Sequence, residues 1–563
     1  MLDRFLPRIE FDSYEDFIEN YKVNIPPLFN FGFDIVDEWA KRDKNKKALV
    51  WRDDHDNEEI LSFEDVRVLS NKTANFFKSL GIRKGSMVLL LLRQRWEYWI
   101  CAVALHKIGA IVIPGPVLLT AKDIKYRVEM GGIDTIISVN DNYIVSQIEE
   151  ARPVIPMVQN YILVNGERAG WLPYGKSIAA FSDAFPRPTG AQAHTNEDIM
   201  LIYFTSGTTG MPKMVRHNFT HPLGHIVTAK YWHKVQEDKL HMSVAESAWA
   251  KFGWGKIYGQ WICGAVIFAY DMDKFVPAKM LSMLEEYRVT TFCAPVTMFR
   301  FMLQEDVSKY DLSSVERYCT AGEPLNPEVF KKWKDLTGLE MVEGFGQSES
   351  TVLLSNFDDW FPIKPGSMGK PCPLYNIKLI DEEGNESADG DEGEIVIADL
   401  DKSFPTGLFI GYLGMEELGG PNTRNYGLGD VAWRDSDGYY WFVGRNDDVI
   451  KCSGYRIGPF EVESALAEHK AVVESAVTAA PDEIRGQVVK ATIVLAKGYE
   501  PSESLVKELQ DHVKKVTAPY KYPRIVEFVS ELPKTVGGKI RRAQIRAADM
   551  GIDTKGTAHD ARF

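Results

Sequence analysis

The stretch FTSGTTGMPK, residues 204–213, has the composition of a phosphate-binding loop. Its glycines leave backbone N–H groups accessible to a ligand, and its hydroxyl side chains can donate to phosphate oxygens. Lys213 adds a positive charge. The nucleotide-hydrolase P-loop, G-x-x-x-x-G-K-[ST], is excluded because Gly207 and Gly210 are only three residues apart. The stretch therefore predicts a phosphate site of another kind, with a solvent-exposed loop as the alternative. Its hydroxyl donors would be Thr205, Ser206, Thr208 and Thr209.

The stretch EGFGQSES, residues 343–350, comes close to two familiar motifs and matches neither. A dinucleotide-binding fingerprint needs glycine where Glu349 stands, and a hydrolase nucleophile elbow needs glycine where Ser350 stands. What remains is a turn that offers an aromatic ring, Phe345, and the Glu349 carboxylate. A carboxylate close to phosphates is repulsive unless it holds a cation, so Mg²⁺ is implied if ATP binds here. The alternative is that Glu349 caps the helix that follows.

Two further polar stretches carry groups that suit a nucleotide. In YGLGDVAWRDSDGYYWFVGR, residues 426–445, Asp430 can accept two hydrogen bonds from the vicinal diol of a ribose, and Arg445 can reinforce it. The alternative for Asp430 is a turn residue. In LPKTVGGKIRRAQIR, residues 532–546, Lys539 follows two glycines at a predicted turn, and the alternative is a solvated basic tail.

Three histidines spaced by four residues, His217, His221 and His225, would share one face of a helix. Pro222 lies among them and no carboxylate is close in the sequence. We therefore expect no metal site there.

The elements that position these stretches follow an α/β pattern. Residues 86–92 predict a buried strand, residues 97–110 a helix with its apolar face inward, and residues 111–115 the next strand of a βαβ unit. Continuous apolar strands bounded by helices predict parallel sheets covered on both faces, with ligands at the carboxyl ends of the strands. Further strands are predicted at residues 134–140, 199–204, 290–295 and 315–323.

The pattern changes after about residue 370, where short strands are broken by acidic Gly/Asn/Asp turns. Such turns predict an antiparallel, hairpin-rich subdomain. A polar linker near residues 444–448 then divides a large N-terminal domain, residues 1–445, from a small α+β C-terminal domain, residues 446–563. In the small domain we expect strands at residues 472–481, 488–496 and 524–530 and a helix at residues 503–516.

Composition limits the partners. A chain of 563 residues should hold two to four folding units, and a net charge of −14 with a pI near 5.4 argues against a nucleic-acid partner. Six cysteines without a C-x-x-C pair predict reduced, buried thiols. The acidic start lacks an apolar core, and the longest apolar runs fall short of the roughly 18 residues that a spanning helix needs. We expect a soluble, cytoplasmic protein without a membrane span; a homo-oligomer is compatible with the sequence.

Taken together, the four stretches resemble the adenylate-forming superfamily, which includes acyl-CoA synthetases, firefly luciferase and peptide-synthetase adenylation domains. YFTSGTTGMPK, GFGQSE, YGLGDVAW and LPKTVGGKIRR occur in that family's order and spacing across essentially the whole chain. The segments PLFNFGFDIVDEWA and VTAPYKYPRIVEFVSELPKT, with Met214 where many relatives have glycine, resemble medium-chain acyl-CoA synthetases in particular.

The resemblance implies two half-reactions. A medium- or branched-chain carboxylate attacks the α-phosphate of Mg·ATP to give acyl-adenylate and pyrophosphate, and the coenzyme A thiol then displaces AMP. It implies that Lys539 bridges carboxylate and phosphate oxygens and that Glu349 holds Mg²⁺. The ATP-binding residues that it implies are Thr205, Ser206, Gly207, Thr208, Thr209, Gly210, Lys213, Gly322, Glu323, Pro324, Phe345, Gly346, Gln347, Ser348, Asp430, Arg445 and Arg456.

The resemblance further implies a small domain that rotates between the half-reactions about a hinge at Asp447. Ser453, Gly454 and Tyr455 would then face the thiol tunnel. Acetate-specific relatives carry tryptophan where Gly346 stands, so the acyl pocket is expected to be open beyond two carbons, with Trp249 or Trp254 as its floor.

Two other functions stay open at the level of sequence. One is an adenylate-forming enzyme with a different acceptor, such as oxygen or a carrier-protein thiol. The other is a catalytically silent binder that keeps the fold. Retention of Lys539, Glu349 and Asp430 argues against the silent binder, because a binder needs no adenylation lysine.

Overall fold

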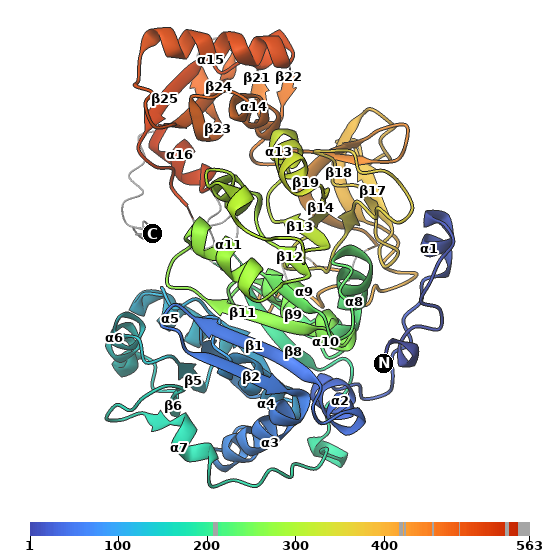
Figure 1. The fold of residues 1–563 in the computed structure, drawn as a ribbon, viewed down its shortest axis with the longest axis vertical. Helices are drawn as coiled ribbons and strands as arrows, with labels where there is room; N and C mark the ends of the chain where they lie inside the picture. The colour runs from blue at the N-terminus through green and yellow to red at the C-terminus, as the bar shows by residue number, and fades with distance from the viewer. Residues whose placement is uncertain are drawn as a thin grey trace.

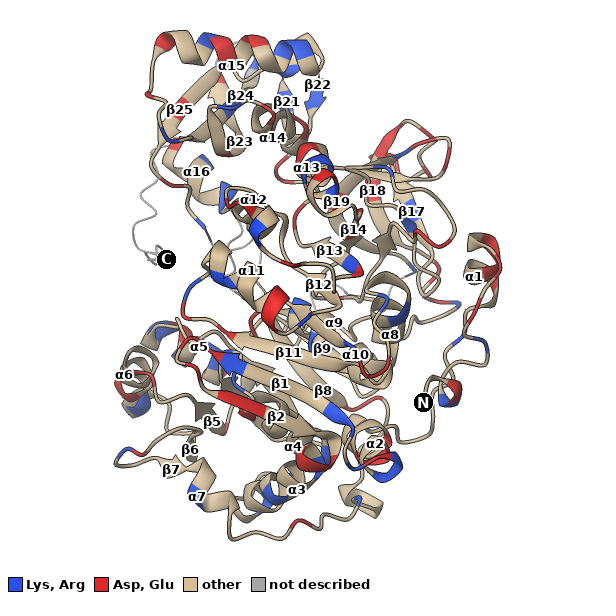
Figure 2. Cartoon of the chain, viewed as in Figure 1, with Lys and Arg blue, Asp and Glu red and all other residues tan. Residues whose placement is uncertain are grey.

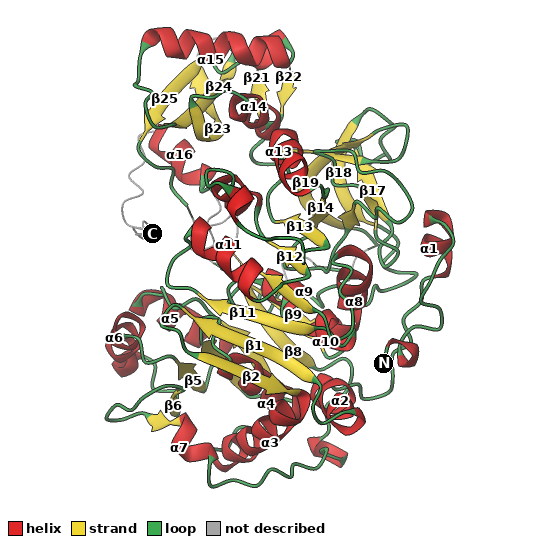
Figure 3. Ribbon diagram, viewed as in Figure 1, coloured by secondary structure: helices red, strands yellow, loops and turns green. Residues whose placement is uncertain are grey.

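The structure is a computed structural model that describes residues 1–205, 212–415, 420–421, 424–452, 455–482, 485–534 and 540–549. Figure 1 shows two large sheets in the lower and middle parts of the molecule, a smaller sheet beside them, and a compact unit of sheet and helices at the top. Figure 3 shows helices along the outer faces of the large sheets, as expected for parallel strands buried on both sides.

The first large sheet has the order β7-β6-β5-β3-β4-β8-β9. Its strands are parallel except β9, which runs antiparallel to β8 with Thr205 opposite Lys213. The predicted βαβ unit is confirmed, because β3 and β4 are parallel neighbours. The bounds are β3 Met87–Leu91, β4 Ile111–Pro114, β5 Thr135–Ser138, β6 Asn160–Leu163, β7 Leu172–Pro173, β8 Ile199–Thr205 and β9 Lys213–Asn218.

The second large sheet has the order β16-β15-β14-β13-β12-β10-β11-β1-β2. The strands from β14 to β1 are parallel, and antiparallel strands close both edges. The bounds are β1 Lys47–Asp53, β2 Glu58–Ser62, β10 Leu240–Ser243, β11 Val266–Asp271, β12 Thr291–Cys293, β13 Arg317–Ala321, β14 Met341–Phe345, β15 Leu354–Ser355 and β16 Lys370–Pro371.

Helix α4 differs from its prediction. We expected one apolar face inward, but all twelve residues of α4, Glu97–Ile108, are buried. A helix buried all round must satisfy its polar side chains internally, and Lys107 does so by donating to Asp37 (2.6 Å), Ser70 (3.1 Å) and Asn71 (2.7 Å).

The other helices of the large domain lie around these sheets. Helix α3 begins with a capping box in which Ser62 and Asp65 exchange hydrogen bonds with each other's backbone N–H groups. The bounds are α1 Tyr14–Asn20, α2 Asp37–Arg42, α3 Phe63–Ser79, α5 Ala121–Gly131, α6 Asn142–Ala151, α7 Tyr174–Ile178, α8 His221–Val227, α9 Ala250–Gly255, α10 Tyr258–Ile262, α11 Pro277–Glu286, α12 Val296–Met302 and α13 Pro327–Thr337.

The hairpin-rich region is an antiparallel sheet in the order β17-β18-β19-β20, with bounds Ile377–Ile380, Glu392–Ile397, Tyr426–Arg434 and Tyr440–Arg445. The top unit in Figure 1 then begins at β21. It has its own hydrophobic cluster and comprises β21 Ile450–Cys452, β22 Tyr455–Ile457, α14 Pro459–Ala467, β23 Val472–Asp482, β24 Gly486–Leu495, α15 Glu503–Val516, β25 Ile525–Val529 and α16 Arg542–Asp549.

Three general observations complete the fold. Figure 2 shows charges of both signs interspersed along the outer helices. All six cysteines are free and buried, as predicted. Within the described ranges, helices that are both long and apolar enough to cross a membrane are absent.

Candidate active site

Two of the predicted site stretches, residues 204–213 and 343–350, come together beyond the ends of β8 and β14. Strand β9 returns from the first stretch, and His217 near its end donates from Nε2 to the carbonyl oxygen of Ser348 at 2.8 Å. Lys213, at the start of β9, places its Nζ 5.1 Å from the ring centre of Tyr412. The structure therefore brings the described ends of the first stretch, Thr205 and Lys213, beside the turn that follows β14.

Glu349 is the buried carboxyl group of this turn. The hydroxyl of Tyr412 donates to Oε1 at 2.9 Å, and Tyr412 in turn contacts the hydroxyl of Tyr426 at 3.1 Å. Burial raises the pKa of Glu349, while the Tyr412 hydrogen bond and the charges of Lys213 and Arg445 oppose that rise. The alternative of a helix cap is wrong, because the described chain continues from Glu349 into turns and β15.

Asp430 and Arg445 face each other across β19 and β20. Arg445 Nη1 lies 3.5 Å from Asp430 Oδ1, and the Asp430 side chain is 6% exposed. The side-chain amide of Gln347 donates to Asp430 and to the carbonyl oxygen of Leu428 at 2.8 Å. These contacts join Asp430 and Arg445 to the turn that carries Glu349.

The AGEPL stretch, residues 321–325, lies at the end of β13, and its carboxylate is already engaged. Both oxygens of Glu323 accept hydrogen bonds from Thr297, from the backbone N–H at 2.6 Å and from the hydroxyl at 2.9 Å. Glu323 thereby holds the start of α12. Gly322 has φ +97°, a conformation that favours glycine, and precedes Pro324 at the strand end.

Two polar partners of this stretch escaped the sequence analysis. Lys251 in α9 donates to the carbonyl oxygen of Ala321 at 2.8 Å. Glu343 accepts from the backbone N–H of Leu325 at 3.1 Å, and burial raises its pKa to about 8. Lys251 could have been found from the sequence, because a lysine in the otherwise apolar segment 245–259 indicates a polar contact. Glu343 gave no such signal, because it was considered only as the first residue of EGFGQSES.

Gly346 packs directly against Trp254. A Cβ on Gly346 would lie 2.4 Å from the indole Cη2 of Trp254 and 2.6 Å from the carbonyl oxygen of Thr351, so only glycine fits without a shift. Trp254 is 5% exposed and donates from Nε1 to the carbonyl oxygen of Ser350 at 3.2 Å. Trp249 lies just before α9, and its Nε1 is buried without a hydrogen-bond partner among the described residues.

Several predicted site residues lie elsewhere or outside the described ranges. Arg456 pairs with Glu382 and lies 3.4 Å from Glu392, so this arrangement directs it to the β17–β18 hairpin. Asp447 Oδ1 lies 3.9 Å from Arg445 Nε. Tyr455 begins β22. Ser206, Gly207, Thr208, Thr209, Gly210, Ser453, Gly454 and Lys539 lie outside the described residues.

The three histidines spaced by four residues lie on β9 and α8. His217, His221 and His225 are all buried, and the described residues contain no group of three or more His, Cys, Asp or Glu side chains arranged for a metal ion.

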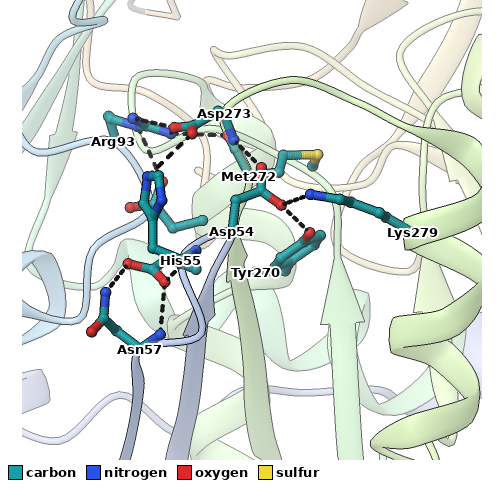
Figure 4. Close-up of polar contacts among 10 residues, drawn as sticks. Asp54, His55, Asn57, Arg93, Tyr270, Met272, Asp273 and Lys279 are labelled. Carbon is teal, nitrogen blue, oxygen red and sulfur yellow. Dashed lines mark hydrogen bonds and ion pairs between the residues drawn. The ribbon is translucent and has the colours of Figure 1, made fainter.

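A separate polar cavity of about 180 Å³ lies at the ends of β1, β3 and β11. Figure 4 shows its ion pairs, in which Arg93 donates to Asp273 at 3.1 Å and Lys279 to Asp54 at 2.9 Å. His55 Nε2 lies 3.4 Å from Asp273. The pair of Arg93 with Asp273 joins the two large sheets. Because the arginine and the aspartates of this cluster already neutralise one another, it offers no unmatched positive charge for a phosphate.

Comparisons with known proteins show the family to which this chain is similar. The sequence model of the family described as AMP-binding enzyme matches residues 36–413, and that of the AMP-binding enzyme C-terminal domain matches residues 461–539. Acyl-coenzyme A synthetase ACSM3, mitochondrial, of Homo sapiens is 40% identical over 95% of this chain and 92% of its own length. Acyl-coenzyme A synthetase ACSM4, mitochondrial, of Homo sapiens is 41% identical over 93% of this chain and 91% of its own length.

The fold has counterparts among solved structures. That of the anthranilate CoA ligase AuaEII in complex with anthranoyl-AMP has a TM-score of 0.84 and 30% identity, and the match covers 93% of this chain and 98% of the ligase.

Proposed function

The chain belongs to the AMP-binding enzyme family as an AMP-forming acyl-CoA synthetase, and from that premise we propose how its site works and on which acids. A medium- or branched-chain carboxylate oxygen attacks the α-phosphorus of ATP, and the bond to pyrophosphate breaks. The thiol sulfur of coenzyme A then attacks the acyl carbonyl, the adenylate oxygen leaves with AMP, and the thiol proton passes to solvent.

The observation that carries this assignment is the junction of two polar clusters at one turn. Gln347 binds Asp430, while Glu349 two residues later binds Tyr412 and has Lys213 nearby. Asp430 and Arg445 are suited to a ribose diol, and Lys213 with the glycine- and hydroxyl-rich stretch before it is suited to the β- and γ-phosphates. We assign the adenine to the end of β13 beside Gly322 and Pro324, with Phe345 against the purine.

The residues fit a magnesium ion. Mg²⁺ is usually held by one or two carboxylates together with substrate phosphates, and Glu349 is a single buried carboxylate beside the proposed phosphate loop. A bound Mg²⁺ would neutralise phosphate charge as it develops. Glu349 serves this role only when ionised, and the hydroxyl of Tyr412 and the charge of Lys213 favour that form.

We assign catalysis of the first half-reaction to Lys539. We assign the switch from the first to the second half-reaction to a rotation of residues 446–563 about Asp447. The sheets on either side of Arg445 are separate, and the unit that begins at β21 has its own main hydrophobic cluster, which supports this boundary. One small cluster, Val431, Val443 and Val449, spans it. The pairing of Arg456 with Glu382 and Glu392 holds one orientation of the small domain, so Arg456 reaches phosphate only after those contacts open. In the rotated state Ser453, Gly454 and Tyr455 face coenzyme A.

We place the acyl chain between Gly346, Trp249 and Trp254. Gly346 leaves room that Trp254 now fills, so the position of one indole sets the depth of the pocket. Each added methylene changes binding by ~0.8 kcal/mol, about fourfold, so chain-length preference is graded. This arrangement favours medium and short branched acids over acetate.

We also propose a cytoplasmic location. The names of the relatives include "mitochondrial". The free, buried cysteines fit the cytoplasm and the mitochondrial interior equally, because both are reducing. Imaging of a fusion that carries the tag at the carboxyl end, so that the amino end stays native, distinguishes the two locations.

The proposed function is tested with purified protein, Mg·ATP and acids from acetate to decanoate, with branched and aromatic acids added. Pyrophosphate is measured with and without coenzyme A, and Lys539→Ala is measured in parallel. We expect acid-dependent pyrophosphate that coenzyme A stimulates and a loss of about 10²–10³ in the variant. Release that is indifferent to coenzyme A would favour a carrier-protein thiol as acceptor, and no release with any acid would exclude the proposal.

A further inference from the structure

Three buried imidazoles contact one another in a row beside the candidate active site without belonging to the groups assigned above. We call His217 of β9 and His221 and His225 of α8 the histidine ladder. Their ring centres are 3.8 Å apart between His217 and His221 and 4.6 Å apart between His221 and His225. All three are at most 2% exposed, so their ring nitrogens can pair only within the protein, and Nδ1 of His217 has no partner among the described residues.

The partners determine where the protons lie. Carbonyl oxygens only accept, so His217 carries its proton on Nε2, 2.8 Å from the oxygen of Ser348, and His221 on Nδ1, 3.2 Å from the oxygen of Gly407. The Nε2 of neutral His221 is then an acceptor, and the Nε2 of His225 lies 3.1 Å away as its donor. Burial lowers the pKa of His217 to about 4 and that of His225 to about 3, consistent with a neutral ladder.

The two carbonyl groups that the ladder holds belong to the two segments that meet at Glu349. Ser348 immediately precedes Glu349. Gly407 begins the other segment, in which the backbone N–H of Phe409 donates to the Glu349 carbonyl oxygen at 2.8 Å and the hydroxyl of Tyr412 donates to the Glu349 carboxylate at 2.9 Å. The histidine ladder therefore holds both backbone segments that contact Glu349, the one at Ser348 and the one that begins at Gly407.

Close packing restricts that second segment further. A Cβ on Gly224 of α8 would lie 2.7 Å from both the Cα of Gly407 and the carbonyl oxygen of Thr406, so α8 touches this backbone directly. Strand β9 holds the rest of the segment, because the N–H of Arg216 donates to the oxygen of Gly411 at 3.1 Å. The segment can shift only if β9 and α8 shift with it.

We infer that His217 and His221 are positioning residues that orient Glu349 through the carbonyl groups of Ser348 and Gly407. The inference rests on the proposed role of Glu349 as the cation ligand. The ladder touches no substrate; it sets the direction and the distance at which the carboxylate meets a divalent cation on ATP. Loss of a ladder donor should therefore weaken cation binding more than it slows turnover.

The test compares two substitutions of one histidine. In His217→Gln the side-chain amide replaces the Nε2–H donor, whereas His217→Met fills the space without a donor. Binding of Mn²⁺ to the protein with ATP, in the absence of acid and coenzyme A, is measured by the paramagnetic signal of free Mn²⁺. We expect about a 5- to 30-fold weaker affinity in His217→Met, near-normal affinity in His217→Gln, and a matching rise in the KM for Mg·ATP with a smaller change in kcat.

A matched control removes the same kind of hydrogen bond elsewhere. His194 is buried and donates from Nε2 to the carbonyl oxygen of Phe29 at 2.9 Å. His194→Met should lower the thermal midpoint as His217→Met does but leave Mn²⁺ affinity unchanged. If His217→Met does not fold, His221→Leu and His221→Asn make the same comparison, since the asparagine amide can replace Nδ1–H.

Two outcomes overturn the inference. One is unchanged Mn²⁺ affinity in the donor-less variant, and the other is equal loss in the Gln and Met variants, which would indicate packing alone. Failure of the proposed function is distinguishable, because it appears in the unsubstituted enzyme as ATP-dependent Mn²⁺ binding without pyrophosphate release, or as no ATP binding at all.

Discussion

Glu349 must be ionised to hold a cation, yet its surroundings favour the neutral form. Burial raises its pKa, and the Tyr412 hydroxyl is the largest opposing contribution. In its proposed role the carboxyl group binds Mg²⁺ only after losing its proton, so Mg²⁺ affinity should rise with pH and fall on the acid side of the raised pKa. Replacing Tyr412 with Phe removes a donor to the charged form and should move that acid limb to higher pH by up to about one unit.

The measurement for Glu349 is a Mg²⁺ titration of pyrophosphate release between pH 5 and 8.5. Glu349→Gln keeps an acceptor for Tyr412 and should lose at least about 10² in rate with no fall in thermal midpoint, since a buried charge is removed. If the acid limb of the pH profile of Mg²⁺ affinity does not move in Tyr412→Phe, the assignment of Glu349 as the group that binds Mg²⁺ is contradicted.

Glu343 predicts a pH dependence of stability of a different origin. Its pKa is about 8 in the folded protein and 4.5 in its unperturbed state, so the folded protein binds more protons than the unfolded chain between these values. Stability should therefore fall as pH rises from 4.5 through 8. Glu343→Gln keeps the acceptor for Leu325 N–H and should flatten the decline in thermal midpoint between pH 5 and 8.5 by a few degrees.

A control for Glu343 is Glu340→Gln, an exposed change that removes only a surface pair with Lys334. It should leave the pH profile as it is. A profile for Glu343→Gln that parallels that of the unsubstituted protein would show that the Glu343 carboxyl group is ionised over the whole range.

At the scale of elements, α9 sets the depth of the proposed acyl pocket. Trp254 sits against Gly346 and meets Trp232 edge-on with ring centres 6.1 Å apart. Trp254→Leu opens that space and should raise the ratio of kcat/KM for decanoate over butyrate by about fourfold for each methylene that the new space holds. It should also destabilise the protein by about 2–4 kcal/mol through the lost packing.

Trp333 of α13 provides the matched control for Trp254. It is fully buried in the second core cluster, away from the proposed pocket. Trp333→Leu should cost similar stability and leave the chain-length ratio unchanged. Equal ratios in both variants would mean that Trp254 does not line the acyl pocket.

The elements that sequence could predict are those with a strong local signal. The helix predicted at residues 503–516 is α15 with the same bounds, and the buried strands were found because their apolar runs are continuous. Asp430 and Arg445 were paired correctly because both lie in one hairpin.

What escaped prediction depends on contacts between distant segments. Tyr412 reaches Glu349 from a stretch without regular periodicity, and Glu323 is engaged by Thr297 of another element. The burial of α4 on every side also depends on its neighbours, since only Asp37, Ser70 and Asn71 make Lys107 tolerable there. Local patterns carry no information on such partners.

At the scale of the whole molecule, two adjacent carboxylates at the proposed domain boundary, Asp447 and Asp448, have different partners. Asp447 lies 3.9 Å from Arg445 in the large domain. Asp448 pairs with Arg546 of α16, the helix that begins three residues after Lys539. The side chains of Asp448 and Arg546 are 15% and 19% exposed, so solvent screens this pair only in part. The pair connects the end of the proposed hinge to α16, which follows the proposed adenylation lysine in the sequence.

This arrangement predicts a charge-swap result. Asp448→Arg and Arg546→Asp should each place like charges together and lower the rate of pyrophosphate formation by about 10-fold or more. The double variant should recover most of that loss, with a coupling of about 1–3 kcal/mol. Thioester formation from synthetic acyl-adenylate, which does not use Lys539, should be less affected by either single change. If the double variant is no better than the poorer single one, or if both half-reactions fall equally, the pair acts on general stability and not on the placement of α16.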